Sequence, residues 1–255
     1  MAIIEYTTEG HVAIITINRP EARNAVNAEV ARGVEDAIDR LEGDDSLWLG
    51  ILTGVPPVFS AGADLKEINA GRAGELQTPR GGFAGITRRE RSKPIIAAVD
   101  GPALAGGTEI TLACDLIVAS KTARFGIPEV KRSLVAAGGG LFRLPRKLPF
   151  NVAMELTLTG DPIDAERAHQ FGLVNVLCEP GQALDKAKEL AGRIEANAPV
   201  AVRESRKVVY SAMTEDEETG WSLSAKAMAI AMGSEDMKEG LTAFIEKRPP
   251  NWSGK

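Results

Sequence analysis

The chain has 255 residues, of which 44% are hydrophobic and 25% are charged, and its formal net charge is -5. This composition is typical of a soluble globular protein with a large core. The negative balance and the scattered lysines and arginines argue against nucleic acid as the main partner. No stretch approaches the roughly 18 apolar residues of a membrane span, and the first ten residues do not resemble a signal peptide. We therefore expect a cytoplasmic protein.

The cysteines and histidines favour structural roles. Cys114 and Cys178 lie far apart in apolar surroundings, which predicts two buried free thiols rather than a disulfide. His11 and His169 are distant from each other in sequence and from any carboxylate motif. A metal site would need more ligands than this pattern provides, so the sequence predicts no metal.

The first third of the chain predicts a strand, a helix and a second strand. Residues 11–19, HVAIITINR, form a β-branched run typical of a strand, and Pro20 ends it. A helix follows, whose apolar residues recur on one face; these are Val30, Val34, Ala37, Ile38 and Leu41. Gly43 and two aspartates end that helix, and LWLGILTG at 47–54 predicts the next strand. A helix between two strands favours parallel pairing.

The segment from Lys66 to Lys93 has a different character. It is polar, contains several glycines and shows only weak helical periodicity. We expect such a segment to be mobile and to act as a lid or as the wall of a pocket. It ends in TRRERSK at 87–93, the densest basic group of the chain. A solvated helix face is the favoured interpretation of that group, and a phosphate site is the alternative.

Beyond residue 93, short strands alternate with helices. The predicted strands are 94–101, 115–120, 123–130 and 173–180. The predicted helices are a buried one at 106–115 and others at 139–148, 152–160 and 164–172, where Gly172 is typical of a C-cap. After Pro180 three more helices are predicted, at 182–198, 198–213 and 220–233. The last carries more apolar surface than an outer helix needs, so it either packs against another subunit or covers its own domain.

Two turns of small residues are candidates for chemistry. Ser60-Ala61-Gly62-Ala63 follows the strand at 47–54, and Gly106-Gly107 precedes the buried helix. Each turn either permits tight packing or presents a free backbone N–H to a ligand. One N–H from each turn would form an oxyanion hole that stabilises a thioester oxygen as charge develops on it.

Two glutamates accompany these turns. Glu109 lies inside the buried helix, where a carboxylate is costly unless it is paired or has a chemical task. Glu129 follows Pro128 at the edge of an apolar strand. Two carboxylates beside one oxyanion hole suit general acid–base work, in which one removes a proton while the other supplies one. Taken separately, each glutamate could instead be a surface or capping residue.

Four stretches together resemble the crotonase, or enoyl-CoA hydratase, superfamily. They are FSAGADLKE, DGPALAGGTEI, FGIPEVKRSLVAAGGGLFRL and SEDMKEGLTAFIEKRPP. The similarity runs in register over essentially the whole chain. It implies an α/β fold, in which residues 1–197 form a crotonase-like spiral of repeated β-β-α units. Residues 198–255 would form a helical region that builds trimers, often paired into hexamers.

The resemblance also implies a site. The oxyanion donors match the N–H groups of Ala63 and Gly106, and the acid–base pair matches Glu109 and Glu129. The acyl-CoA binding surface matches a larger set, which is Arg23, Ala25, Ala61, Ala63, Asp64, Leu65, Lys66 and Gly106. Lys247 matches a basic position that in relatives can reach a CoA phosphate from an adjacent subunit.

The implied activity is the addition of water across the 2,3 double bond of a 2-enoyl-CoA, giving a 3-hydroxyacyl-CoA in fatty-acid or related acyl-CoA breakdown. Coenzyme A would be part of the substrate, and no metal or redox cofactor would be needed. An isomerase, another crotonase-type lyase and a non-catalytic acyl-CoA-binding protein remain alternatives. Relatives commonly carry Pro-Gly where this chain has Ala136-Ala137, so the methyl group of Ala137 narrows the space for the water.

Overall fold

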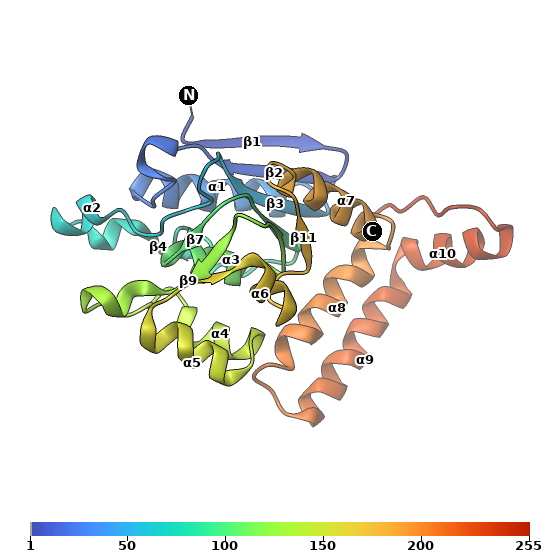
Figure 1. Cartoon of the computed structure of the whole chain (residues 1–255). Helices are drawn as coiled ribbons and strands as arrows, with labels where there is room; N and C mark the ends of the chain where they lie inside the picture. The colour runs from blue at the N-terminus through green and yellow to red at the C-terminus, as the bar shows by residue number, and fades with distance from the viewer. Residues whose placement is uncertain (1) are drawn as a thin grey trace.

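The computed structural model describes residues 2–255, which are organised around a six-stranded sheet in the order β1-β2-β3-β6-β8-β11 (Figure 1). The strands are Ile4–Glu9 (β1), Val12–Ile17 (β2), Leu49–Gly54 (β3), Ile95–Val99 (β6), Leu116–Ser120 (β8) and Val176–Cys178 (β11). Neighbouring strands pair in parallel, except that β1 runs antiparallel to β2. The predicted parallel pairing of the strands at 11–19 and 47–54 is therefore confirmed.

The helix predicted between these two strands is α1, Ala28–Gly43. The side chain of Asn27 caps it by accepting a hydrogen bond from the N–H of Val30 at 2.9 Å. Its apolar face is buried against the sheet, and Leu41 and Ile38 are fully enclosed. The edge strand β1 was not among the predicted elements, because its sequence IEYTTE is half polar and leaves little of the strand buried.

A smaller sheet in the order β10-β9-β7 lies beside the first. Its strands are Ala103–Leu104 (β7), Arg124–Gly126 (β9) and Ile163–Asp164 (β10). The chain passes from β6 into β7 and from β8 into β9, so successive turns add a strand to each sheet. The helices that complete these turns are Gly106–Ala113 (α3), Gly140–Lys147 (α4), Phe150–Thr159 (α5) and Ala165–Gln170 (α6). This arrangement is the predicted spiral of strand–strand–helix units.

The large sheet is buried on both faces. Alternate strand residues such as Ile15 and Ala97 face α1 and α3 in the main core. Their neighbours, such as Ile51 and Ile96, face α7 (Ala183–Glu195), which supplies small alanine side chains. Burial on both faces explains why these strands are continuous apolar runs in the sequence.

The segment from Lys66 to Lys93 is more ordered in its contacts than the sequence predicts. It contains helix α2 (Leu65–Asn69), a short 3-10 helix (Ala73–Leu76) and a hairpin of β4 (Gln77–Thr78) with β5 (Gly82–Phe83). Leu76 and Ile86 are almost fully buried. The basic stretch at 87–93 forms no helix, so the predicted helix face is wrong; Arg89 and Arg91 instead pair with Asp39 and Asp115.

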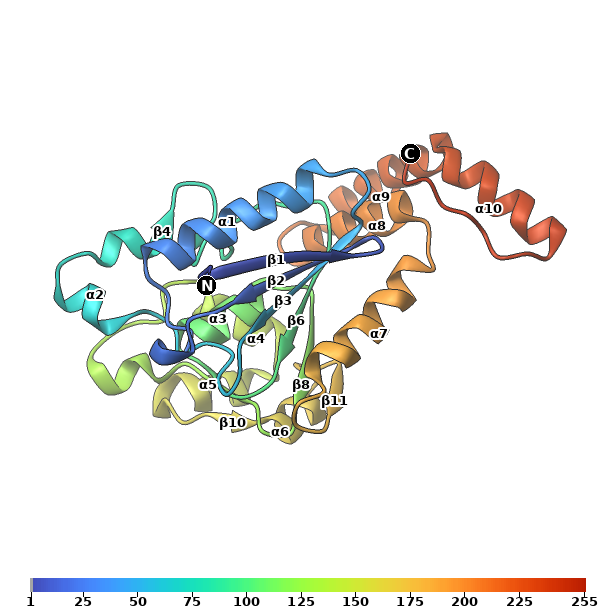
Figure 2. The same cartoon turned by 90° about the horizontal axis from the view of Figure 1, so that it is seen from above.

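Three helices at the end of the chain extend away from the core (Figures 1 and 2). They are Pro199–Ser211 (α8), Glu217–Gly233 (α9) and Glu235–Glu246 (α10). Arg206 of α8 ties this region to the core through an ion pair of 2.7 Å with Asp115. Helix α9 buries no residue, and Trp221 and Met228 are 68% and 61% exposed. Apart from its packing on α8, the apolar surface of α9 is therefore left uncovered within this chain.

Several expectations concern groups outside the core architecture. Cys114 and Cys178 are both buried and unbridged, as predicted. Within residues 2–255, no group of histidine, cysteine, aspartate or glutamate side chains has the arrangement of a metal site. In the same range no helix has the length and apolar character needed to cross a membrane.

Candidate active site

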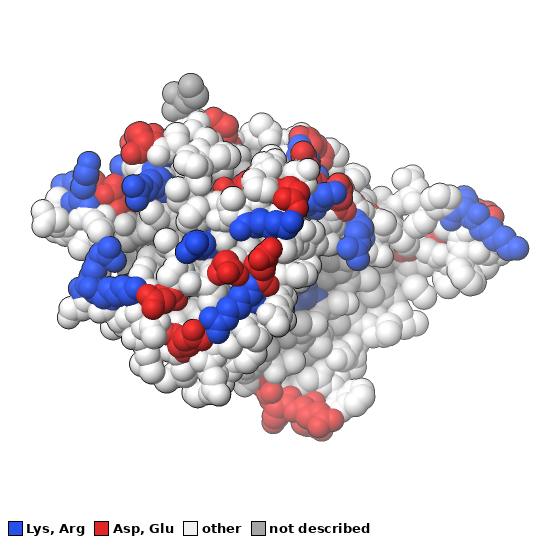
Figure 3. Space-filling view, in the orientation of Figure 1, with Lys and Arg blue, Asp and Glu red and all other residues white. Residues whose placement is uncertain are grey.

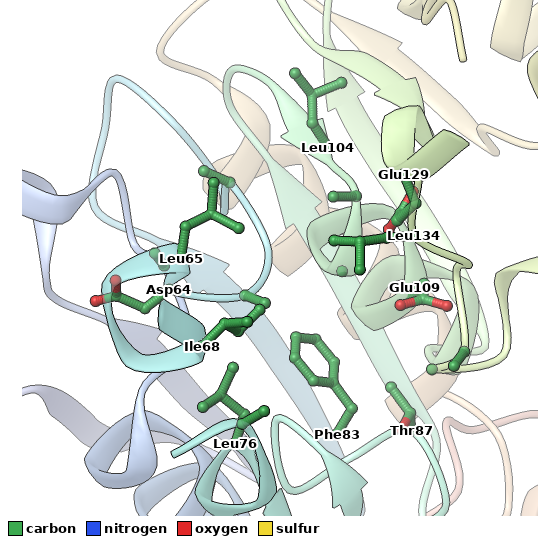
Figure 4. Close-up of a pocket in the computed structure, with 18 of the residues that line it drawn as sticks. Asp64, Leu65, Ile68, Leu76, Phe83, Thr87, Leu104, Glu109, Glu129 and Leu134 are labelled. Atoms are coloured by element: carbon green, nitrogen blue, oxygen red, sulfur yellow. The ribbon is translucent and has the colours of Figure 1, made fainter. Parts of the chain in front are cut away.

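One large cavity, of about 1330 Å³, opens beside the N-terminus of α3. Its walls come from the loops that follow β2 and β3, from the passage between β7 and α3, from the 66–93 segment and from the stretch that leads from β9 into α4. Figure 4 shows Glu109 and Glu129 on one side of this cavity, and Ile68, Leu76 and Phe83 on the other. Charged and apolar side chains thus face each other across the same space.

The loop after β3 presents the N–H of Ala63 to the cavity. Ala63 forms a parallel bridge with Val26, in which the N–H of Val26 donates to Gly62 at 2.7 Å and the N–H of Asp64 donates to Val26 at 2.9 Å. In such a bridge the N–H of the central residue points to the opposite side. Within residues 2–255 the N–H of Ala63 donates no hydrogen bond, and Ala63 lines the cavity.

The N-terminus of α3 presents the second donor. Ala105 precedes the helix with a strained backbone, at φ 53° and ψ -127°, which turns the chain so that Gly106 begins α3. A Cβ on Gly62 would lie 2.6 Å from the nitrogen of Gly106, so the two turns are in direct contact. The N–H of Gly106 also donates no hydrogen bond within residues 2–255. The two donors are therefore adjacent, at the positive end of a helix.

Glu109 is held one helical turn into α3. Its side chain is buried, and Oε1 accepts a hydrogen bond from the N–H of Gly140 at 2.9 Å. Burial raises the pKa of this carboxyl, while hydrogen bonds from Gly140 and Gly138 and the charge of Arg143 oppose the rise. The carboxyl is thus fixed in place and more basic than an ordinary glutamate.

Glu129 belongs to the short 3-10 helix Pro128–Arg132 that follows β9. Burial, and to a lesser extent the negative charge of Glu109, raise the pKa of Glu129 to about 7. Its Oε2 atom is buried and has no hydrogen-bond partner within residues 2–255. A half-buried carboxyl with a pKa near neutrality can hold a proton and release it, which suits a general acid.

Comparisons with known proteins show the family of this chain. The family model for enoyl-CoA hydratase/isomerase matches residues 7–255. This chain belongs to the enoyl-CoA hydratase/isomerase family. Enoyl-CoA hydratase EchA19 of Mycobacterium tuberculosis is 40% identical over 96% of this chain and 94% of its own length. The short-chain-enoyl-CoA hydratase of Clostridium acetobutylicum is 40% identical over 94% of this chain and 93% of its own.

A solved structure extends the comparison to the fold. The crystal structure of an enoyl-CoA hydratase from Mycobacterium tuberculosis superposes with a TM-score of 0.96 at 49% identity, covering 100% of both chains. The predicted superfamily and the predicted crotonase-like fold are thereby confirmed. The roles of individual residues and the division at residue 197 stay predictions.

Most of the residues that were matched to the family's acyl-CoA binding surface lie around the cavity. Those that line it, besides the two donors and two glutamates, are Arg23, Ala25, Ala61, Asp64, Leu65 and Lys66. Lys247 lies at the end of α10 and is not part of the lining. Lys247 is predicted to contact a CoA phosphate bound to an adjacent subunit. A single chain does not test this contact, so it stays a prediction.

Asp64 is the N-cap residue of α2. Its side chain accepts a hydrogen bond from the N–H of Lys66 at 2.9 Å and begins α2. Burial opposes its ionisation, but the hydrogen bonds from Arg19, at 2.7 Å, and from Lys66 outweigh that effect and lower its pKa. Asp64 therefore stays charged and fixes the start of α2 beside Ala63.

Sequence reasoning missed several members of the site in this enoyl-CoA hydratase/isomerase family member. Gly138 and Gly140 surround the carboxyl of Glu109, and a Cβ on Gly138 would lie 2.6 Å from its Oε2 atom. The run of three glycines after Ala137 was the available signal for this close approach. Ala137 lines the cavity as expected. Phe83 was also missed, because no local pattern marks it as part of the site.

Proposed function

We propose that this protein is an enoyl-CoA hydratase, which adds water across the 2,3 double bond of a 2-enoyl-CoA thioester to give a 3-hydroxyacyl-CoA. The observation that carries the proposal is the convergence on one cavity of two carboxyls and two backbone donors that are unpaired within residues 2–255. The donors suit a thioester oxygen, and the carboxyls suit the two proton transfers of hydration. Dehydration of a 3-hydroxyacyl-CoA is the same reaction in reverse.

In the proposed mechanism the thioester oxygen accepts hydrogen bonds from the N–H groups of Ala63 and Gly106. Glu109 orients a water molecule and takes one of its protons as the water oxygen bonds to C3. Charge from the double bond moves onto the thioester oxygen, where the two N–H groups stabilise it. Glu129 then delivers a proton to C2, and the carbonyl re-forms. Before the next turnover Glu109 must lose the proton that it took from water, and Glu129 must gain one.

The same chemistry needs no metal and no redox cofactor. The thioester carbonyl itself accepts the charge, and the reaction moves protons without changing the oxidation state of the enzyme. Coenzyme A enters as part of the substrate. Its expected binding surface runs from Arg23 and Ala25 to Lys66, along one wall of the cavity. The expected setting is fatty-acid or related acyl-CoA breakdown in the cytoplasm.

We further propose that the chain assembles as a trimer or as a hexamer built from two trimers. The support is the exposed apolar surface of α9, where Trp221, Met228, Ile230 and Met232 are all more than half exposed. In Figure 3 the face formed by α8 and α9 carries few charges apart from an acidic cluster at its lower end, whereas positive and negative side chains alternate over the core. An uncharged apolar face of this kind is typical of a subunit interface.

Absorbance of the conjugated enoyl thioester separates the candidate activities. A hydratase consumes the signal of crotonyl-CoA, whereas an isomerase generates it from a 3-enoyl-CoA. A non-catalytic member would bind crotonyl-CoA and leave the signal unchanged. The pair of glutamates favours hydration, because an isomerase usually relies on a different acid–base set. Unchanged absorbance with wild-type protein across a panel of enoyl-CoA chain lengths would refute the proposed function.

A further inference from the structure

Glu35 of α1 binds the 66–93 segment, which forms one wall of the cavity. Its exposed fraction is only 8%. Its carboxylate accepts hydrogen bonds from the hydroxyl of Thr78 and, at 2.6 Å, from the backbone N–H of Gly81. A buried carboxylate is costly unless such donors satisfy it. Glu35 therefore holds the turn between β4 and β5 on the surface of α1.

Two further carboxylates on α1 also bind the 66–93 segment. Asp39 pairs with Arg80 and Arg89, and Glu42 accepts hydrogen bonds of 2.9 Å from the backbone N–H groups that follow Arg91. Residues 35, 39 and 42 are spaced four and three apart, so they lie on one face of the helix. One helix face thus holds the wall at several points along its length.

The contact between the turn and α1 leaves little freedom. A Cβ on Gly85 would lie 2.2 Å from the carbonyl oxygen of Ala31 and 2.7 Å from the backbone nitrogen of Glu35. The backbone of the turn therefore lies directly on the backbone of α1. Glu35 holds the turn between β4 and β5 at Gly81, and Gly85, just after β5, packs against α1. The residues between Gly81 and Gly85 therefore have a fixed position.

Phe83 is the residue that lies between these two anchors and faces the cavity. A Cβ on Gly106 would lie 2.4 Å from Cε1 of the Phe83 ring, so the ring packs directly against the second oxyanion donor. Phe83 shares its side of the cavity with Leu76 and Ile68 (Figure 4). The N–H of Ala84 donates to the carbonyl of Leu76 at 3.0 Å, which joins Phe83 to the rest of the wall.

We propose that Glu35 is a positioning residue which, by fixing Phe83 against Gly106, makes this site selective for slim, unbranched acyl chains. The inference rests on the proposed function, because it concerns the acyl group of the same thioester. An aromatic ring held beside the oxyanion donor occupies space that a branch or a ring on the first carbons of the acyl chain would need. Loosening the turn lets Phe83 retreat and admits such groups.

The test compares crotonyl-CoA with the ring-bearing cinnamoyl-CoA. We expect Glu35→Ala to raise the kcat/KM for cinnamoyl-CoA relative to crotonyl-CoA by roughly tenfold, the lower end of what one methylene group decides in an apolar pocket. The change should appear mainly in KM. Phe83→Ala should shift the ratio in the same direction. Glu35→Gln keeps one acceptor oxygen and should give an intermediate ratio.

Asp36→Ala is the matched control, since Asp36 is the exposed neighbouring acid on α1 and should leave the ratio at its wild-type value. Melting temperatures of all variants separate selectivity from unfolding, and Glu35→Gln carries the test if Glu35→Ala does not fold. An equal loss for both substrates, or an unchanged ratio in Glu35→Ala and Glu35→Gln, would overturn the inference.

A binding measurement keeps this inference apart from the proposed function. Calorimetry with butyryl-CoA and benzoyl-CoA asks the same question without turnover. We expect Glu35→Ala to improve benzoyl-CoA affinity relative to butyryl-CoA. A wild-type protein without hydratase activity refutes the proposed function, whereas an unchanged ratio of dissociation constants refutes the role of Glu35.

Discussion

The contact between the two small-residue turns makes Gly62→Ala the most direct test of the oxyanion hole. Gly62 has φ +85°, and a Cβ there would lie 2.6 Å from the nitrogen of Gly106 and 3.0 Å from Cβ of Ala105. The left-handed backbone costs an alanine about 1–2 kcal/mol. The methyl group must also displace Gly106, whose N–H then misses the thioester oxygen. Loss of one such donor typically costs about 2.7–4 kcal/mol of transition-state stabilisation, on the order of 10²–10³ in kcat.

We therefore expect Gly62→Ala to lower kcat for hydration of crotonyl-CoA by about 10²–10³. The rate is measured from the decrease in absorbance of the enoyl thioester. Gly71→Ala is the matched control. Gly71 has a similar φ of +77°, but nothing lies within 4 Å of its added Cβ. That variant should lose some thermal stability and keep its kcat. A folded Gly62→Ala protein with wild-type kcat would show that the thioester oxygen is held elsewhere.

Three other predictions concern the acid–base pair and the assembly. Glu109→Gln and Glu129→Gln should each lose hydration by roughly 10² or more while calorimetry still detects acyl-CoA binding; normal turnover in either variant would remove that residue from the mechanism. Because the pKa of Glu129 is raised from its ordinary 4.5 to about 7, the folded chain binds more protons than the unfolded one between these values. The free energy of unfolding should therefore fall as pH rises through that window. Above the window kcat should decline as the acid loses its proton. Denaturant titrations should show that the free energy of unfolding depends less on pH in Glu129→Gln than in the wild type. Light scattering should report a trimer or hexamer that Trp221→Glu or Met228→Glu dissociates, and a wild-type monomer at micromolar concentration would contradict the proposed assembly.

The parts of the fold that follow from local periodicity were predictable. The apolar face of α1 and the continuous apolar runs of β3 and β6 carry their own signals, because burial on one or two faces imposes a fixed pattern. The 66–93 segment has no such pattern. Its order comes from contacts such as that between Glu35 and Gly81, which are separated by 46 residues. A local interpretation of the sequence therefore misses the contacts that anchor this wall of the cavity.

The same distinction applies to the site. Ala63, Gly106 and Glu109 lie in short motifs whose residue types already suggest close backbone approach and a costly buried acid. The partners that fix them do not lie in these motifs. Glu109 is held by Gly140, 31 residues further along the chain, and Gly106 packs against Phe83 from a different loop. The sequence alone predicts which groups react, whereas the folded chain shows which groups hold them.

The site also concentrates groups that would be unfavourable elsewhere in the fold. Ala105 has a strained backbone, the Oε2 atom of Glu129 is buried without a partner, and two backbone N–H groups are unpaired within residues 2–255. The strained backbone and the buried unpaired oxygen each cost on the order of 1–3 kcal/mol, whereas the two N–H groups face the cavity, where water satisfies them. The parallel bridges at Val26 and Ser60 hold the turns in place. The unpaired donors match a thioester oxygen, and a protonated Glu129 matches the carbon that must receive a proton. In the proposed mechanism the thioester oxygen replaces water on the two N–H groups, and only the strengthening of these hydrogen bonds as charge reaches the oxygen lowers the barrier to hydration.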